Sequence, residues 1–167
     1  KSTDRWSRIQ QRTDATRFER PQRDHDRLAH HGKLFVRERI KLLLDPGTPF
    51  LEFSSLAANS EYGGNSKGAS VVTGIGIVSG REVIIRADDP SIKGGAWYPL
   101  TVKKNVRCLD IAIENRLPVV HMCDSACGFL PLQSEPFAAQ VLPPQSSGIN
   151  TFVPQLAAPN VSFPSRP

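Results

Sequence analysis

The chain has few cysteines and no long hydrophobic run, and each shortage excludes a class of protein. Only three of the 167 residues are cysteines, and their spacing matches neither a disulfide framework nor a zinc motif. We therefore expect reduced thiols, as in proteins kept inside a cell or an organelle. No apolar stretch approaches the roughly 20 residues that a membrane-spanning helix needs, and no secretory signal is visible. A membrane partner is accordingly not expected.

The excess of positive charge is confined to the N-terminal quarter. Residues 1–41 contain twelve Lys or Arg and six Asp or Glu, whereas the rest of the chain contains nine and ten. Basic and acidic residues alternate there and aromatic residues are few, a pattern that favours a solvated helical face over a nucleic-acid-binding surface. The three histidines between residues 25 and 31 fit no standard metal spacing. We predict neither a metal nor a nucleic-acid partner.

Both ends of the chain lack the hydrophobic period of a packed core. Residues 1–31 are polar and Arg-rich, which is typical of an extended arm or a poorly packed helix, interrupted at Pro21. Residues 138–167 contain six of the fourteen prolines and one charged residue. A segment of this composition is expected to be irregular, either disordered or draped over a surface. The predicted folded part is therefore residues 32–137.

Periodicity and turn signals predict a mixed α/β structure for this part. The expected elements are a helix over 33–44, a short strand over 49–53, strands over 71–78 and 82–87, a helix over 99–115 and a strand over 118–123. Ser79-Gly80 forms a tight hairpin turn, and the run Val83-Ile84-Ile85 predicts a strand buried on both faces. The last three elements form one βαβ unit with parallel strands.

The predicted helix that begins at Pro99 has a favourable first residue and one apolar stripe. Val102, Val106, Leu109 and Ile113 recur at helical spacing, which is typical of an amphipathic helix. Lys103 and Lys104 lie on its first turns, where we interpret both as solvated surface residues.

Several residues near the predicted strand ends could carry chemistry. Asp88 and Asp89 could be paired acid and base carboxylates, although strand-end and loop acids are the favoured interpretation. His121 lies in an apolar strand, which favours a buried, hydrogen-bonded histidine over a catalytic one. Cys127 beside Gly128 resembles a nucleophile on a turn, but no Cys/His pair can be argued from the spacing.

Three long segments resemble one enzyme family. They are GKLFVRERIKLLLDPGTPFLE (32–52), VVTGIGIVSGREVIIRADDPSIKGGAWYPLTVKKNVRCLDIAIENRLPVV (71–120) and DSACGFLPLQSE (124–135). These segments are similar to the carboxyltransferase (β) subunit of biotin-dependent acyl-CoA carboxylases. The similarity is closest to methylcrotonyl-CoA carboxylase, with propionyl-CoA carboxylase as a near relative. It covers roughly residues 30–137, about two-thirds of the chain.

The resemblance implies a crotonase-like fold of stacked ββα superhelical units, here incomplete. It also implies a hexamer of β subunits with biotin-carrying α subunits. The activity it implies is transfer of a carboxyl group from carboxybiotin to an acyl-CoA such as 3-methylcrotonyl-CoA, a step of leucine catabolism. The expected location is the mitochondrial matrix in a eukaryote or the cytoplasm in a bacterium.

The resemblance also points to candidate site residues. Backbone N–H groups that stabilise an enolate oxygen follow a strand ending in Asp-Ser in this family, at a Gly-Gly pair. The matching positions here are Ala126 and Cys127, with Gly128 following, so the sequence departs from the family pattern. Lys93, Gly94 and Gly95 match a loop that approaches acyl-CoA, and Lys93 could meet a CoA phosphate. The alternative is that the two glycines only form the turn before the helix.

The tail departs from the family altogether. Because residues 138–167 match no part of it, and because the chain starts at Lys1 with its only Met internal, we expect an N-terminal fragment of such a subunit, inactive alone. One alternative is a truncated, non-catalytic paralogue that binds full-length carboxylase subunits. Another is a stand-alone crotonase-type hydrolase or isomerase, for which Glu135 is the nearest candidate carboxylate to Gly128.

Overall fold

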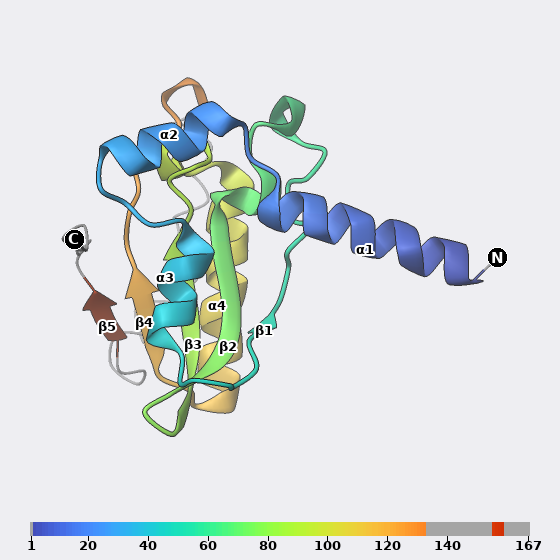
Figure 1. Cartoon of the computed structure of the whole chain (residues 1–167). Helices are drawn as coiled ribbons and strands as arrows, with labels where there is room; N and C mark the ends of the chain where they lie inside the picture. Colours follow the sequence, from blue (N-terminus) through green and yellow to red (C-terminus); the bar gives the residue numbers. More distant parts are fainter. Residues whose placement is uncertain (1, 133–154, 159–167) are drawn as a thin grey trace.

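A computed structural model describes residues 2–132 and 155–158 of the chain (Figure 1). Its centre is a five-stranded sheet in the order β1-β2-β3-β4-β5. The strands are β1 (Leu51–Glu52), β2 (Val71–Val78), β3 (Arg81–Asp88), β4 (Val119–Met122) and β5 (Gln155–Ala158). The first three are antiparallel neighbours, whereas β3, β4 and β5 run parallel. The predicted parallel pairing of β3 with β4 is confirmed.

The β2–β3 hairpin forms where the sequence predicts it. Ser79 and Gly80 both have left-handed backbone angles, with φ values of 51° and 73°, as a two-residue hairpin turn requires. Both N–H groups donate to the Asp45 carboxylate over 2.7 Å. From Val83 to Asp88 every residue of β3 is buried, which confirms that this strand is covered on both faces.

Helices cover the two faces of the sheet. Helix α3 (Val36–Leu43) lies on one face, where its Val36 and Ile40 share a core with β2, β3 and β4 residues. Helix α4 (Pro99–Asn115) lies on the other, where its Cys108 and Ala112 pack against Ile84 and Val119. Figure 1 shows the sheet between these two helices. The core thus has three layers, as expected of an α/β segment.

Helix α4 begins and ends as predicted, but a different face is buried. Val102 is the only member of the predicted apolar stripe that is buried, and Ile113 is 38% exposed. The buried residues are Thr101, Val102, Lys104, Asn105, Cys108 and Ala112. The polar members Thr101 and Lys104 bond to backbone carbonyls, and Asn105 bonds to Arg86. The small residues Cys108 and Ala112 pack on the sheet. Val102 also borders a cavity, together with the partly buried Val106 and Leu109.

The prediction that Lys104 is solvated is wrong, while Lys103 is exposed as expected. Lys104 is only 5% exposed, and its Nζ donates to the carbonyls of Gly68 and Val71 over 3.0 and 2.7 Å. Those carbonyls belong to the irregular turn before β2 and the first residue of that strand. A buried ammonium is tolerated only with such partners, and burial lowers the pKa of Lys104 to about 8.

We therefore predict that the free energy of unfolding rises with pH between 8 and 9. In this range the unfolded chain keeps the Lys104 proton that the folded chain releases, so folding is favoured as pH increases, by about 1 kcal/mol. Above pH 9 the rise should level off, because Cys108 acts in the opposite direction. Burial raises the pKa of Cys108 to about 12, so the unfolded thiol ionises before the folded one and the free energy of unfolding falls. Denaturant unfolding at several pH values measures this. Lys104→Met should remove the rise and the exposed Lys103→Met should keep it; a rise that survives Lys104→Met contradicts the assignment.

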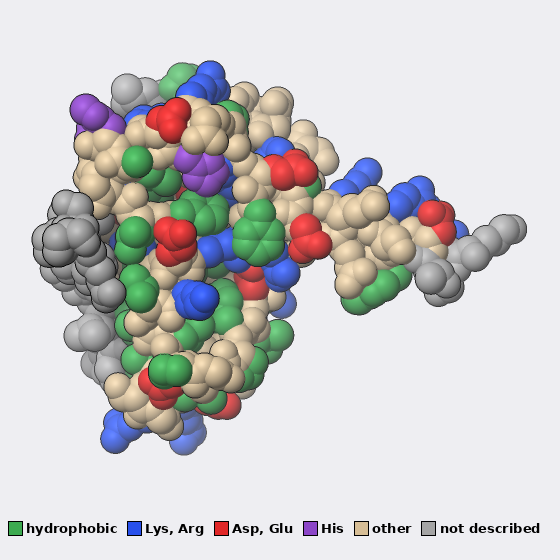
Figure 2. Space-filling view, viewed as in Figure 1, with side chains coloured by type: hydrophobic (Ala, Val, Ile, Leu, Met, Phe, Trp, Pro, Cys, Tyr) green, Lys and Arg blue, Asp and Glu red, His purple; other side chains and the backbone are tan. Residues whose placement is uncertain are grey.

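The N-terminal region is two helices rather than a uniformly unpacked arm. Helix α1 (Ser2–Phe18) projects from the body (Figures 1 and 2), and the chain breaks at Pro21 as predicted. Helix α2 (Gln22–His30) packs on the body, with Leu28 buried. Between them Arg20 forms an ion pair with Asp89 over 2.8 Å. The Arg-rich segment thus supplies the partner of Asp89, the acid that follows β3, a contact that composition alone does not reveal.

The structure also corrects one part of the predicted irregular tail. Gln155–Ala158 is strand β5, which pairs with the whole of β4. An uncovered strand edge presents unpaired backbone groups, and β5 supplies partners for those of β4. These four residues can pair because they lack the prolines that surround them in the sequence. The rest of the tail lies outside the described residues. Within the described part, no helix is both long and apolar enough to cross a membrane.

Candidate functional site

Two loops meet at the carboxyl end of the sheet. One follows β3 and contains Lys93 to Trp97; the other follows β4 and contains Asp124 to Phe129. Because β3 and β4 are parallel neighbours, their carboxyl ends lie side by side. Backbone bonds join the loops: Ala126 N–H donates to Gly94 O (3.0 Å), Trp97 N–H to Cys127 O (3.0 Å) and Phe129 N–H to Trp97 O (2.8 Å). The two sequence-predicted site segments therefore form one unit.

The loop glycines are required for this junction. Gly95 has φ 73°, and a Cβ added there would overlap the carbonyl oxygen of Asp124 and lie 3.2 Å from Ser125 Cα. Gly94 has φ 67°, and its added Cβ would approach the Ala126 side chain at 3.4 Å. The glycines thus do more than form a turn before α4, because they let the second loop pack directly against the first.

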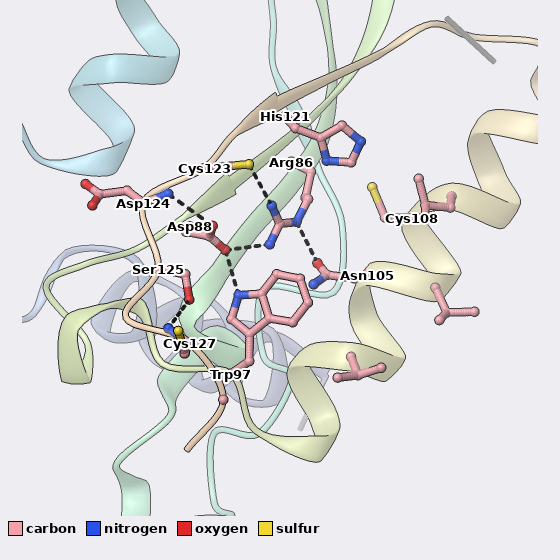
Figure 3. Close-up of a pocket in the computed structure, with 14 residues that line it drawn as sticks. Arg86, Asp88, Trp97, Asn105, Cys108, His121, Cys123, Asp124, Ser125 and Cys127 are labelled. Atoms are coloured by element: carbon pink, nitrogen blue, oxygen red, sulfur yellow. Dashed lines mark hydrogen bonds and ion pairs between the residues drawn. The ribbon is translucent and has the colours of Figure 1, made fainter. Parts of the chain in front are cut away.

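Asp88 holds the junction to the end of β3. Its carboxylate is buried and accepts hydrogen bonds from Arg86 Nη2 (2.6 Å), Trp97 Nε1 (3.2 Å) and the N–H of Asp124 (3.2 Å) (Figure 3). Burial raises the pKa of Asp88, while the Arg86 charge opposes that rise. Asp89 pairs instead with Arg20. The two acids serve separate ion pairs, which confirms the interpretation as strand-end and loop acids.

Arg86 is the central cation of the site. It is 4% exposed, its guanidinium lies 4.7 Å from the Trp97 ring centroid, and its Nε donates to Asn105 Oδ1 over 3.2 Å. Its Nη1 also lies 3.8 Å from Cys123 Sγ. These contacts join β3, β4, α4 and the Trp97 loop (Figure 3). Sequence reasoning missed this group; the one available signal was a charged residue within the apolar run of β3.

A second ion-pair cluster fixes the other side of the junction. Asp124 accepts from Lys33 Nζ over 2.6 Å and from Arg39 Nη1 over 3.4 Å. Lys33 precedes α3 and Arg39 lies within it. Helix α3 and the segment before it therefore help to place the loop that contains Cys127.

The cluster around Arg86 borders a cavity of about 1020 Å³. Its wall on α4 is mostly apolar, with Asn105 as its polar residue. All three cysteines of the chain line the cavity: Cys108, Cys123 and Cys127. Two buried polar atoms, Asn105 Nδ2 and His121 Nε2, have no hydrogen-bond partner among the described residues. The prediction of a buried, hydrogen-bonded His121 is therefore wrong: the residue is half-buried and its Nε2 has no partner among the described residues. Burial, assisted by the Arg86 charge, lowers the pKa of His121, so the imidazole is neutral near pH 7.

The three candidate oxyanion-hole residues lie together on the second loop. The Ala126 N–H is already donated to Gly94 O, and the Cys127 N–H lies 3.3 Å from Ser125 Oγ, a long contact. The Gly128 N–H has no partner within the described part of the chain. Lys93 is exposed and borders a separate cleft of about 490 Å³ that also includes Arg20, Arg23, Arg27 and Lys67. Across the described ranges, no three His, Cys, Asp or Glu side chains are placed to hold a metal ion.

Cys127 has a strained backbone, with φ 90°, a conformation that a residue with a Cβ rarely adopts. We predict that Cys127→Gly raises the free energy of unfolding by about 1 kcal/mol, because glycine relieves this strain. Cys127→Ala is the matched control: it removes the thiol but keeps the Cβ, and should give no such gain. Equal stabilisation by both substitutions in denaturant unfolding would assign the effect to the thiol and contradict the strain.

Comparisons with known proteins agree with this arrangement. Residues 27–137 match the family described as carboxyl transferase domain. The chain is 50% identical over 116 residues to the biotin-dependent 3-methylcrotonyl-coenzyme A carboxylase beta1 subunit of Mycobacterium tuberculosis, covering 70% of this chain and 22% of that protein. It is 50% identical over 115 residues to the probable mitochondrial methylcrotonoyl-CoA carboxylase beta chain of Drosophila melanogaster, covering 67% and 20%.

A solved structure shares the fold. The transcarboxylase 12S structure, described as a hexamer assembly with hydrolysed methylmalonyl-coenzyme A bound, superposes with a TM-score of 0.79 at 21% identity, covering 95% of this chain and 32% of that chain. The predicted crotonase-like α/β fold, present here in part, is thereby confirmed. The chain spans about a fifth of the length of the curated relatives it matches. By sequence and by fold, this chain belongs to the carboxyl transferase domain family.

Proposed function

We propose that this chain forms the acyl-CoA-binding part of the carboxyltransferase site of a biotin-dependent acyl-CoA carboxylase. The observation that carries the proposal is the junction of the two loops beside a cavity with an apolar wall. The similarity to methylcrotonyl-CoA carboxylase beta subunits supports 3-methylcrotonyl-CoA as the substrate and leucine catabolism as the setting. Because the matched segment is only about a fifth of each relative's length, the complete reaction requires parts beyond this chain.

The geometry suits stabilisation of an enolate. Removing a proton from the acyl group places negative charge on the thioester oxygen, and backbone N–H groups directed at that oxygen lower the barrier. The Ala126 N–H is used within the loop junction, whereas the Cys127 N–H makes only the long 3.3 Å contact with Ser125 Oγ. We therefore assign this role to the N–H groups of Cys127 and Gly128. The apolar α4 wall would hold the acyl chain, and the exposed Lys93 would meet a CoA phosphate.

The remaining components would come from partner subunits. The carboxyl donor, carboxybiotin, would be carried by a biotin-carrying α subunit, and we assign none of the described residues to it. Other β subunits would complete a hexamer. The location would be the mitochondrial matrix if the source is a eukaryote, as for the Drosophila relative, or the cytoplasm if it is bacterial.

Calorimetry of the purified chain with 3-methylcrotonyl-CoA and with free CoA tests the proposal. We expect saturable binding that is tighter for the acyl form. Lys93→Ala should weaken both ligands alike, whereas Leu109→Ala should remove only the preference for the acyl form. Arg81→Ala, an exposed cation at the opposite end of β3, is the control and should change neither. No binding up to about 1 mM, a limit of roughly −4 kcal/mol, would overturn the proposal.

A further inference from the structure

Cys127 places a thiol where the proposed function puts a thioester. The side chain is exposed, lines the cavity and belongs to the same residue as one of the two assigned N–H donors. Cys123 is also exposed on the cavity, but it sits against Arg86 at the end of β4 rather than on the turn.

A second, independent observation indicates that the cavity takes a polar ligand atom. The Asn105 side chain lines the cavity and extends from α4 toward Arg86 and Trp97 (Figure 3). It is only 8% exposed, and while its Oδ1 accepts from Arg86, its Nδ2 has no partner among the described residues. A buried N–H without a partner costs about 1–3 kcal/mol. An acceptor oxygen on a bound acyl-CoA would satisfy it.

We propose that Cys127 exchanges thioesters with bound acyl-CoA and becomes S-acylated. The Cys127 thiol loses its proton to solvent, and the thiolate attacks the thioester carbonyl carbon to form a C–S bond. The carbonyl oxygen becomes an oxyanion held by the Gly128 and Cys127 N–H groups. When it re-forms the carbonyl, the bond to the CoA sulfur breaks, and the CoA thiolate takes a proton from water. No oxidant, metal or further reactant is needed.

Other enzymes also combine a nucleophile and an oxyanion-hole N–H in one residue. In serine proteases one residue supplies both the nucleophile and a backbone N–H of the oxyanion hole. A thiolate is the stronger nucleophile at neutral pH. Because one thioester replaces another, the exchange is close to balanced and reversible: acyl-CoA in excess should load Cys127, and free CoA in excess should unload it. This inference rests on the proposed function, since the acyl-CoA must bind first.

Intact-mass and peptide-mapping mass spectrometry of the full chain tests the exchange. The probes are 3-methylcrotonyl-CoA and its saturated counterpart isovaleryl-CoA, which cannot add a thiol across a double bond. We expect both to add the mass of the acyl group alone, at Cys127, at least about tenfold faster than at Cys123, because binding orients only Cys127 toward the carbonyl. The rate should saturate with acyl-CoA concentration. Cys123→Ser should leave the Cys127 modification intact, and Cys127→Ser should abolish it.

Calorimetry with a ketone analogue, in which a methylene group replaces the thioester sulfur, separates the two proposals. Binding of the analogue together with acylation of Cys127 supports both. Binding without acylation, equal labelling of Cys123 and Cys127, or retention of the whole acyl-CoA mass overturns the exchange and leaves the proposed function standing. Absence of analogue binding overturns both.

Discussion

Replacing Gly95 by alanine should destabilise the fold by about 3 kcal/mol and abolish acyl-CoA binding. Two costs add at this position. The backbone has φ 73°, and a left-handed conformation costs a residue with a Cβ about 1–2 kcal/mol. The added methyl also overlaps the Asp124 carbonyl oxygen, and such overpacking costs about 1–3 kcal/mol. Backbone atoms cannot move aside as a side chain does, so the two loops must separate.

Gly80→Ala is a matched control for the first cost alone. Gly80 has the same φ of 73°, but a Cβ there meets nothing within 4 Å. It should therefore lose only about 1 kcal/mol and keep ligand binding. Denaturant unfolding gives the stability difference, and calorimetry gives the binding. Equal losses for the two variants would mean that the loop junction tolerates the methyl group, and would contradict the close packing of the two loops.

Features that depend on neighbouring residues were predictable from the sequence. The Ser79-Gly80 turn and the start of α4 at Pro99 require only local backbone preferences, and both form as expected. The buried β3 strand follows from its run of β-branched residues. The long family-like segments identified the family and the two loops, although no local rule shows that those loops bond to each other.

Features that depend on residues far apart in the sequence were missed. Lys104 is buried because carbonyls more than thirty residues earlier accept its hydrogen bonds, so its neighbours on the helix give no signal. Three residues of the predicted apolar stripe of α4 line a cavity and the fourth, Ile113, is exposed, because the sheet beneath decides which face of this helix is buried. The Arg86 cluster joins residues from β3, α4, the end of β4 and the Trp97 loop, and no local sequence pattern links them. Long-range packing thus sets the site.

Replacing Arg86 by methionine should lower the free energy of unfolding by about 3–5 kcal/mol, because it leaves the Asp88 carboxylate buried without its cation. The loss should depend on pH. Burial already raises the pKa of Asp88, and removing Arg86 raises it further. Above the ordinary value of 3.8, the unfolded carboxyl is ionised while the folded one binds a proton more readily, so stability falls as pH rises. Denaturant unfolding should show the deficit largest at neutral pH and smaller near pH 4.

The double variant Arg86→Met/Asp88→Asn isolates the charge. It removes both ions and keeps an amide that can still accept from Trp97 Nε1, so it should be more stable than Arg86→Met alone at pH 7. Arg86→Lys is the complementary control: it keeps the positive charge but loses the planar contact over Trp97 and the bond to Asn105, so its deficit should be intermediate and insensitive to acid. If the double variant is no more stable than Arg86→Met, the loss comes from packing around Trp97 rather than from the unpaired carboxylate. In that case Arg86 would stabilise the fold mainly through its packing between α4 and the Trp97 ring.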